Sequence, residues 1–259
     1  MTAAAPLAPA SGVKVKDVRT YKLKNAIFVQ VIADNGMSGW GEASPNNRHL
    51  VETFIHTGLK VHVIGRNVWD AEPMWDDMFF GNHDLGQDGV LPYSIGGIDC
   101  ALWDLKGKRV GLPVYKLLGG EYRNKMLAYC SFGLGLGNRK PKPRPMTIDE
   151  TVRLAMKFVE RGFTVVKPRT QFRKRNMNPY PDPTFDYMKA IRKAVGDKSN
   201  CSVCLNSSYN AARGIEMCKR LHEKLGINYA EEVVSTHNLR ELAQVVEALP
   251  FPIIAGETE

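Results

Sequence analysis

Short apolar runs alternate with amphipathic helical patterns from residue 126 to residue 257, and this alternation constrains the fold more than any other feature of the sequence. One run and one helical pattern together recur every ~30–35 residues, which indicates parallel strand–helix–strand units. Five such strands fit either part of a (β/α)8 barrel or a doubly wound sheet. The expected strands are Met126–Ser131, Phe163–Lys167, Ser202–Leu205, Asn228–Glu231 and Pro252–Glu257.

The helices between these strands are marked by caps and by apolar side chains at helical spacing. Thr147 and Glu150 have the spacing of a capping box, and Asn238 can cap the last helix. No Gly-x-Gly-x-x-Gly follows a strand, and no Gly-x-x-x-x-Gly-Lys-Ser/Thr occurs. The nucleotide-binding versions of a doubly wound fold are therefore disfavoured.

The earlier part of the chain shows a different pattern, which predicts a separate α+β domain at residues 13–124. Alternating residues in Val13–Leu23 and Ala26–Ala33 predict two strands, and Gly39–Glu42 predicts a third. Turn residues separate the three strands, so we expect an antiparallel meander. Residues 48–80 have helical patterns. Residues 125–259 then form the second domain.

Composition restricts the class of protein and its partners. The 259 residues include 44% hydrophobic residues, enough for a sizeable core. The net charge of +8 suits an anionic partner, which could be a nucleic acid, a membrane surface or an acidic small molecule. Five cysteines lack the spacing of a disulfide framework, residues 1–12 read as a disordered tail without signal-peptide features, and no run of ~20 apolar residues occurs. These features predict a cytoplasmic protein that does not associate with membranes.

Two basic loops, Arg139–Arg144 and Arg173–Arg175, follow the first two expected strands of the second domain. A charge run is usually a solvated face, but loops at this place in a parallel α/β fold border the active site and can attract an anionic sugar acid. Phe172 and Tyr180 provide little aromatic interleaving, so no nucleic-acid partner is expected.

The carboxyl ends of the expected parallel strands carry the candidate functional residues, because functional groups gather at that edge. Glu231 and Glu257 end successive strands and could share a divalent cation through carboxylate oxygens. Alternatively, each carboxylate caps a helix or forms an ion pair. The other residues at these ends are Lys167, Arg169, Cys204 and Asn206.

Lys167 and Arg169 lie two residues apart, so their side chains point to the same face of a strand. Arginine is effectively always protonated, which makes Arg169 a carboxylate clamp rather than a base. Lys167 could act as a base if desolvation lowers its pKa, or as a charge stabiliser. Both residues could instead simply neutralise their acidic neighbours.

Ser94–Gly120 reads as a buried helix, a turn and a second short helix. Gly107 and Gly111 are expected to break the first helix, and Pro113 can open the second. The string ALWDLKGK followed by GLPVYKLLGG resembles the junction between the capping domain and the barrel in the mandelate racemase/muconate-lactonizing branch of the enolase superfamily. The resemblance implies an α+β capping domain followed by an incomplete (β/α)8 TIM-type barrel with about five βα units.

The resemblance extends to the strand ends. Members of the family end strands two to five with Lys-x-Lys, Asp-x-Asn, Glu-Glu-Pro-like and Gly-Glu motifs, and this chain has Lys-Pro-Arg, Cys-Leu-Asn, Glu-Glu-Val and Gly-Glu there. Glu231 and Glu257 thus match two of the three metal-binding carboxylates, while Cys204 replaces the third. A thiol is a soft ligand and Mg²⁺ prefers hard oxygens, so we expect weakened Mg²⁺ affinity and a possible softer divalent metal.

The resemblance also implies a reaction and a set of substrate-binding residues. The reaction is that of an acid-sugar dehydratase or a racemase, with proton abstraction next to a carboxylate and divalent-metal stabilisation of the enediolate. Capping-domain loops around Ala43–His49 and Gly81–Gly89 would contact the substrate, which adds His49 and His83 to Asn206 and Arg169 as substrate-binding candidates. A zinc or redox pair of Cys201 and Cys204 is disfavoured, because alternation puts them on opposite faces of a strand.

The family barrel has eight strands, whereas this sequence ends just after the fifth. The expectation is therefore a truncated chain that needs a complementing C-terminal half-barrel chain, or that forms a homo-oligomer. The alternative is a catalytically inactive relative that acts as a binding or interaction protein.

Overall fold

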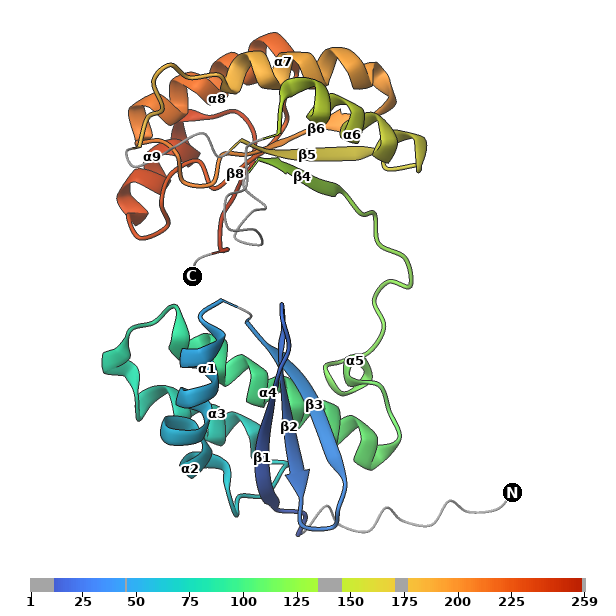
Figure 1. Ribbon diagram of the computed structural model, residues 1–259, viewed down its shortest axis with the longest axis vertical. Helices are drawn as coiled ribbons and strands as arrows, with labels where there is room; N and C mark the ends of the chain where they lie inside the picture. Colours follow the sequence, from blue (N-terminus) through green and yellow to red (C-terminus); the bar gives the residue numbers. More distant parts are fainter. Residues whose placement is uncertain (1–11, 45, 135–145, 171–176, 258–259) are drawn as a thin grey trace. The chain divides into compact units, whose positions relative to one another are not determined.

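The computed structural model describes residues 12–44, 46–134, 146–170 and 177–257. The chain divides into two compact units, Met1–Asn124 and Lys125–Glu259 (Figure 1). Each unit has its own core of buried apolar side chains. The expected tail at residues 1–12 lies outside the described residues except for Gly12. No helix in the described ranges combines the length and the apolar character that a bilayer crossing requires.

The first unit begins with the predicted antiparallel meander. Its strands are β1 (Val15–Lys22), β2 (Ile27–Ala33) and β3 (Ser38–Ala43), and they lie side by side in that order. In β2, fully buried residues alternate with half-buried ones, as expected where one face of a sheet packs on a core. The prediction of three strands from alternation and turn residues is confirmed.

Helices cover the inner face of this sheet (Figure 1). The long helix α4 makes the closest contact, and its partners are β3 and β2. The helical segments are α1 (Arg48–Phe54), the π-helix η1 (Ile55–Leu59), α2 (Lys60–Val63), α3 (Ala71–Phe80), the 3-10 turn η2 (His83–Leu85), α4 (Val90–Val110) and α5 (Val114–Leu117).

Glycine allows α4 to approach β3 this closely. A Cβ atom on Gly39 would lie 2.0 Å from the carbonyl oxygen of Ala101, and one on Gly41 would lie 2.2 Å from that of Gly97. Backbone atoms cannot give way to such contacts without a shift of the helix. The packing of this unit therefore depends on the absence of side chains at the contact between β3 and α4.

The prediction that Gly107 breaks the first helix is wrong, because α4 continues through it to Val110. Gly111 ends the helix in the left-handed region with φ +68°, and Pro113 caps the start of α5 as predicted. A Cβ atom on Gly107 would lie 2.7 Å from the carbonyl oxygen of Leu112. Gly107 therefore does not end the helix. It allows the chain to pass close to α4 as it turns back at Leu112.

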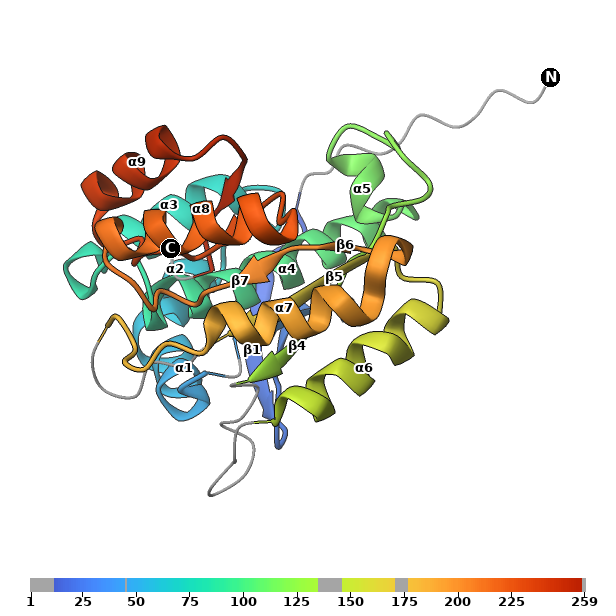
Figure 2. The ribbon, with the colours of Figure 1, turned by 90° about the horizontal axis from the view of Figure 1, so that it is seen from above.

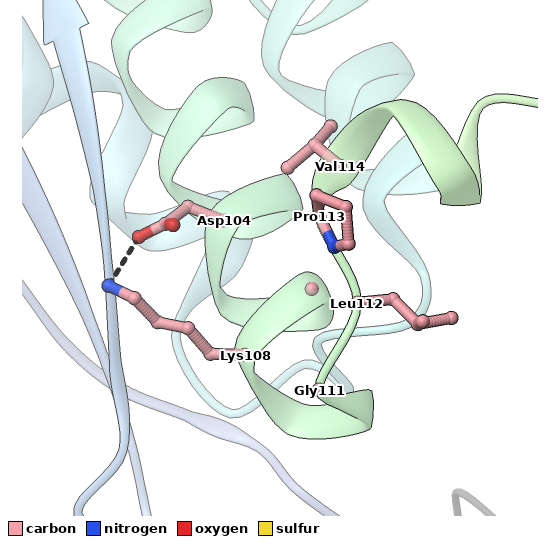
Figure 3. A pocket seen from close by; sticks show the side chains of 7 residues that line it. Asp104, Lys108, Gly111, Leu112, Pro113 and Val114 are labelled. Carbon is pink, nitrogen blue, oxygen red and sulfur yellow. Dashed lines mark hydrogen bonds and ion pairs between the residues drawn. The ribbon is translucent and has the colours of Figure 1, made fainter. Parts of the chain in front are cut away.

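The end of α4 and the turn that leads to α5 border an open hollow of about 320 Å³ (Figure 3). The carboxylate of Asp104 accepts from Lys108 at 2.6 Å on one side of it. None of the candidate site residues from the sequence lines this hollow. The lining residues are Asp104, Gly107, Lys108, Gly111, Leu112, Pro113 and Val114.

The second unit contains a parallel sheet whose strand order follows the chain. Each strand of the path β4-β5-β7-β8-β9 pairs with the one before it, and β6 pairs with β5 beside that path. A doubly wound sheet requires a reversal of strand order, whereas a barrel adds each strand at the same edge. The observed order is that of an incomplete TIM-type barrel. The strands are β4 (Cys130–Leu134), β5 (Val165–Thr170), β6 (Asn200–Cys201), β7 (Val203–Cys204), β8 (Ala230–Glu231) and β9 (Ile253–Ile254).

Helices connect these strands, and α6, α7 and α8 lie over one face of the sheet (Figures 1 and 2). The capping box of Thr147 and Glu150 is present at the start of α6, and the side chain of Asn238 caps α9, as predicted. The helical segments are α6 (Ile148–Glu160), α7 (Thr184–Val195), the 3-10 turn η3 (Gly196–Lys198), α8 (Ala211–Leu225) and α9 (Leu239–Ala248).

Three predicted strand positions are wrong. The last strand, β9, ends at Ile254 rather than at Glu257, so Glu257 lies three residues beyond the strand. The first strand begins at Cys130 rather than at Met126, whose side chain is 74% exposed, so the apolar residues before Cys130 belong to no buried strand. The second strand runs to Thr170 instead of ending at Lys167. Proline at position 168 lacks an N–H and suggests a strand end, yet β5 continues through it. Lys167 and Arg169 thus project from within a strand.

Candidate active site

The carboxyl ends of neighbouring strands bring Cys204, Glu231 and Glu257 together. One candidate ligand atom from each residue, a sulfur and two carboxylate oxygens, lies within 4.8 Å of the others. Strand register explains the grouping, because Arg169 is paired with Cys204 and Cys204 with Glu231 across adjacent parallel strands. The sequence predicts all three residues at strand ends. In the structure Cys204 and Glu231 end β7 and β8, whereas Glu257 follows β9 by three residues and still joins the group.

Lys167 joins this group from β5. Its side chain is only 5% exposed, and its ammonium forms an ion pair with the carboxylate of Glu231. It also donates to the Tyr129 hydroxyl at 3.1 Å and lies 4.5 Å from the centre of that ring. Burial lowers the pKa of Lys167, but the hydrogen bonds with Glu231 and Tyr129 outweigh burial and raise the pKa above its ordinary value. Lys167 is therefore an ammonium in this arrangement.

Arg169 faces the other carboxylate of the group. Its guanidinium lies 4.0 Å from a carboxylate oxygen of Glu257, so Lys167 and Arg169 each lie beside one candidate metal ligand. The buried Nε atom of Arg169 has no hydrogen-bond partner among the described residues. A guanidinium with an unused donor can bind a further carboxylate oxygen.

The Cys204 thiol is buried, and its surroundings keep it protonated. Burial, the charge of Glu231 and a hydrogen bond with Glu231 raise the pKa of this thiol to about 12. Cys201 lies elsewhere, in the apolar core, and does not join the ligand group. The prediction that the two cysteines occupy opposite faces is consistent with this separation. Cys100, Cys130 and Cys218 are also free thiols.

The donor atoms allow a test of which metal this group suits. Two carboxylates are the ligands that hard divalent cations prefer, and they could bind a cation at this strand edge. The third donor is sulfur, which favours softer cations such as Zn²⁺ and is a poor ligand for Mg²⁺. Glu231 and Glu257 could therefore hold a divalent cation, and Cys204 would add a sulfur donor that suits a softer one.

Two residues at the site were not identified as candidates from the sequence. Tyr129 lies just before β4, and its hydroxyl accepts a hydrogen bond from Lys167. The expected strand Met126–Ser131 placed Tyr129 inside a strand rather than at its end, so the sequence did not mark it as a site residue. Glu232 is buried next to Glu231, and its carboxylate accepts hydrogen bonds from the backbone of Gly256 and Glu257. The Glu231-Glu232 doublet at a strand end is the signal that could have identified the second residue.

The remaining candidates do not belong to this group of possible metal ligands. Asn206 follows β7 in the left-handed region with φ +49°, and its role in substrate binding stays a prediction. His49 lies in the first unit, 3.4 Å from the ammonium of Lys22, and His83 contacts the carbonyl oxygen of Phe80 at 2.7 Å. Their approach to substrate also stays a prediction. The basic loops Arg139–Arg144 and Arg173–Arg175 lie outside the described residues.

Known proteins resemble both units. Residues 5–119 match the mandelate racemase / muconate lactonizing enzyme N-terminal domain, and residues 150–259 match the enolase C-terminal domain-like family. An arabinonate dehydratase of Saccharolobus solfataricus is 30% identical over 94% of this chain and 67% of its own length. A D-galactarolactone cycloisomerase of Agrobacterium fabrum is 28% identical over 90% of this chain and 57% of its own length.

Solved structures give the same result. A mandelate racemase/muconate lactonizing protein from Paracoccus denitrificans, complexed with magnesium, has a TM-score of 0.83 and 28% identity, with 95% of this chain and 66% of that chain covered. The 3,6-anhydro-D-galactonate cycloisomerase from Zobellia galactanivorans has a TM-score of 0.77 and 27% identity over 95% and 66% of the two chains.

The chain thus spans between 57% and 67% of the length of these two curated relatives. Both domain families match in the same order as the two compact units, and the dehydratase relative is matched over two thirds of its length. This chain belongs to the mandelate racemase/muconate lactonizing enzyme branch of the enolase superfamily.

Proposed function

We propose that this chain forms all or part of a lyase of the acid-sugar dehydratase type. Such an enzyme removes the proton next to a carboxylate and then expels hydroxide from the neighbouring carbon. The observation that carries the proposal is the gathering of Lys167, Arg169, Cys204, Glu231 and Glu257 at one strand edge. The substrate class follows from the relatives, several of which are named as arabinonate or D-galactonate dehydratases.

Each residue of the group has a distinct part in this proposal. Glu231 and Glu257 would hold a divalent cation, together with Cys204 when the cation accepts sulfur. When bound, such a cation offsets the negative charge that develops on a substrate carboxylate as the α-proton leaves. Arg169 binds and orients the substrate carboxylate, because its guanidinium can donate two parallel hydrogen bonds.

Lys167 could act as a charge stabiliser or as a base, and its ion pair with Glu231 decides between these two roles. While it is paired with Glu231, the ammonium holds its proton and supplies positive charge beside the substrate site. Loss of that ion pair would remove the main cause that favours the ammonium, and the buried amine could then accept a proton. We assign Lys167 the role of charge stabiliser in the arrangement described here, and of base only after Glu231 is released.

We further propose that Cys204 weakens Mg²⁺ binding and shifts the preference toward a softer divalent metal such as Zn²⁺ or Fe²⁺. Replacement of a carboxylate by a thiol removes one negative charge and one hard oxygen from the ligand group. A non-catalytic binding protein is the second candidate function, and the same residue favours it. In that case Lys167 and Arg169 would serve only to neutralise Glu231 and Glu257.

The variant Cys204→Asp tests both proposals, with Cys201→Ser as the matched control in the apolar core. Wild type, Cys204→Asp and Cys201→Ser are incubated with arabinonate and galactonate in D2O with Mg²⁺ or Zn²⁺, and α-proton exchange and dehydration are followed by NMR. Each incubation is repeated with a polypeptide that supplies barrel strands six to eight of a dehydratase relative. Native mass of the untagged protein shows whether a complementing chain or a homo-oligomer accompanies it.

We expect Cys204→Asp to gain Mg²⁺-dependent exchange, and Cys201→Ser to behave as wild type. Such a gain supports descent from an acid-sugar lyase and the assignment of Cys204 to the ligand group. Absence of exchange in all variants, metals and combinations would contradict the lyase and favour the binding protein. Tight Mg²⁺ binding by the wild type would contradict the altered metal preference alone.

A further inference from the structure

We propose that Glu232 is a positioning residue that fixes Glu257, and the loop after β7, at the strand-end site. The inference rests on the proposed function, because it assigns Glu257 to the ligand group. Glu232 itself does not belong to that group, although it follows Glu231 directly in the sequence. It acts through the backbone of one residue that does, Glu257.

The carboxylate of Glu232 binds two segments at once. One oxygen, Oε1, accepts from the backbone N–H of Gly256 at 3.0 Å and from that of Glu257 at 3.1 Å. The other oxygen, Oε2, accepts from the hydroxyl of Ser207 at 3.2 Å. One side chain thus connects the ends of β8 and β9 with the loop that follows β7.

The backbone of Glu232 strengthens the same connection. Its N–H donates to the carbonyl oxygen of Ile254 at 2.9 Å, and its carbonyl oxygen accepts from the N–H of Ser207 at 2.6 Å. Glu232 has φ +50°, in the left-handed region that residues with side chains rarely occupy. Such a conformation persists where surrounding contacts determine it, and here main-chain and side-chain bonds both do so.

Glu257 needs this support because little else in the described chain holds it. Strand β9 contains only Ile253 and Ile254, and the side chain of Glu257 is 53% exposed. The two N–H groups that Glu232 binds belong to Glu257 and to the residue before it. The hydrogen bonds to Glu232 therefore restrain the backbone from which the Glu257 side chain extends.

A carboxylate suits this position better than a neutral group. Glu232 is only 2% exposed, and its described partners are two amides and a hydroxyl rather than a cation. A buried carboxylate is costly unless hydrogen bonds compensate it, and hydrogen bonds to an ionised acceptor are about twice as strong as neutral ones. The charge of Glu232 thus tightens the bonds that hold Glu257.

The test uses the full chain and the variants Glu232→Ala, Glu232→Gln and Tyr209→Phe. Glutamine keeps an oxygen for the two amides but not the charge. Tyr209→Phe is the matched control, because it removes a buried hydroxyl that bonds Asp182 and Thr184, outside the ligand group. Two quantities are measured: hydrogen exchange of the Gly256 and Glu257 amides, and the dissociation constant of Co²⁺ from its visible absorption.

We expect Glu232→Ala to speed exchange at both amides and to weaken Co²⁺ binding about 10–100-fold, the usual effect of losing a residue that orients a metal ligand. Glu232→Gln should fall between the wild type and Glu232→Ala, because it keeps the acceptor oxygen but loses the charge. Tyr209→Phe should change neither quantity. Equal exchange in wild type and Glu232→Ala would overturn the inference, and so would equal weakening by Tyr209→Phe. Failure of the wild type to bind Co²⁺ would instead contradict the proposed metal function.

Discussion

The two units differ in what they bury. Among the described residues, the buried polar or charged side chains of the first unit are Ser94 and Lys106, whereas the second unit buries nine. Those nine are Thr151, Lys167, Thr170, Thr184, Ser199, Ser202, Ser208, Glu232 and Thr236. Burying a polar group lowers the stability of the fold unless the group is hydrogen-bonded. The second unit therefore needs more internal hydrogen bonds than the first.

The charges of the two units differ in the same way. In the first unit, ion pairs such as Lys60–Asp17 and Arg66–Asp77 lie at the surface. Lys106 is the exception, and its ammonium lies 4.3 Å from the ring centre of Trp103, with a pKa that burial lowers. In the second unit, the pair of Lys167 and Glu231 is almost fully buried. The first unit thus places these ion pairs at its surface, whereas the second buries one at its strand ends.

The largest expected effect comes from Glu231→Gln, which leaves the Lys167 ammonium buried without its carboxylate. Removal of one partner of a buried ion pair costs about 3–5 kcal/mol of unfolding free energy. All four tryptophans of the chain lie in the first unit, at positions 40, 69, 75 and 103. The urea concentration at half-unfolding should therefore fall when unfolding is followed by circular dichroism, which reports on both units. It should stay unchanged when unfolding is followed by tryptophan fluorescence, which reports on the first unit.

The double variant Lys167→Met/Glu231→Leu is the control for this prediction. It removes both charges and should recover much of the lost stability, because the cost arises from the unpaired charge and not from the missing contact. A shift of the tryptophan transition as large as the shift in circular dichroism would show that the units unfold together. The comparison between separately stabilised units would then fail.

The second prediction concerns packing in the first unit. Gly39→Ala would place a Cβ atom 2.0 Å from the carbonyl oxygen of Ala101 in α4, and overpacking of this kind costs about 1–3 kcal/mol or more. Gly96→Ala is the matched control on α4, where an added Cβ meets no atom within 4 Å. Alanine should stabilise the helix there by about 0.5–1 kcal/mol. Tryptophan fluorescence in urea measures both changes, and equal effects of the two variants would refute the packing argument.

The same difference between the units explains how much of the fold the sequence could predict. The meander, the capping box at Thr147 and the cap at Asn238 depend on local patterns, and all three were predictable. The length of β5 depends on pairing of Arg169 with Gly133 and Cys204, which lie far apart in the sequence. Pro168 lacks an N–H, which locally disfavours a strand at that position, and the long-range pairing outweighs this effect.

The candidate site shows the same limit. The expected strand ends sufficed to select Lys167, Cys204, Glu231 and Glu257, because parallel strands present their carboxyl ends at one edge. In the structure, however, Lys167 lies within β5 and Glu257 follows β9 by three residues. The ion pair of Lys167 with Glu231 and the bonds of Glu232 to the backbone after β9 could not be predicted. They depend on side-chain directions at positions where the backbone leaves the strand, including a left-handed residue that no local rule requires to be glutamate.

The smallest predicted effect concerns the surface charges of the first unit. Hydrogen bonds from Lys60 and Arg19 lower the pKa of Asp17 from its ordinary value of 3.8 to about 2. A carboxyl group with a depressed pKa stabilises the folded state above its ordinary pKa, and this contribution is lost as pH falls toward the folded value. The contribution of Asp17 should therefore be complete above pH 3.8 and disappear as pH falls to about 2.

Asp17→Asn should cost about 0.5–1 kcal/mol near neutral pH, because this ion pair lies at the surface. Tryptophan fluorescence in urea at a series of pH values should show the wild type and the variant converging as pH falls. Lys60→Met is the control, and a double-mutant cycle with Asp17→Asn isolates the ion pair, whose amine and carboxylate lie 2.6 Å apart. A cost for Asp17→Asn as large as that for Glu231→Gln would mean that surface charge supports the first unit as strongly as buried charge supports the second. The contrast between a packed unit and a polar one would then need revision, because exposed ion pairs are screened by water and should contribute far less than a desolvated pair.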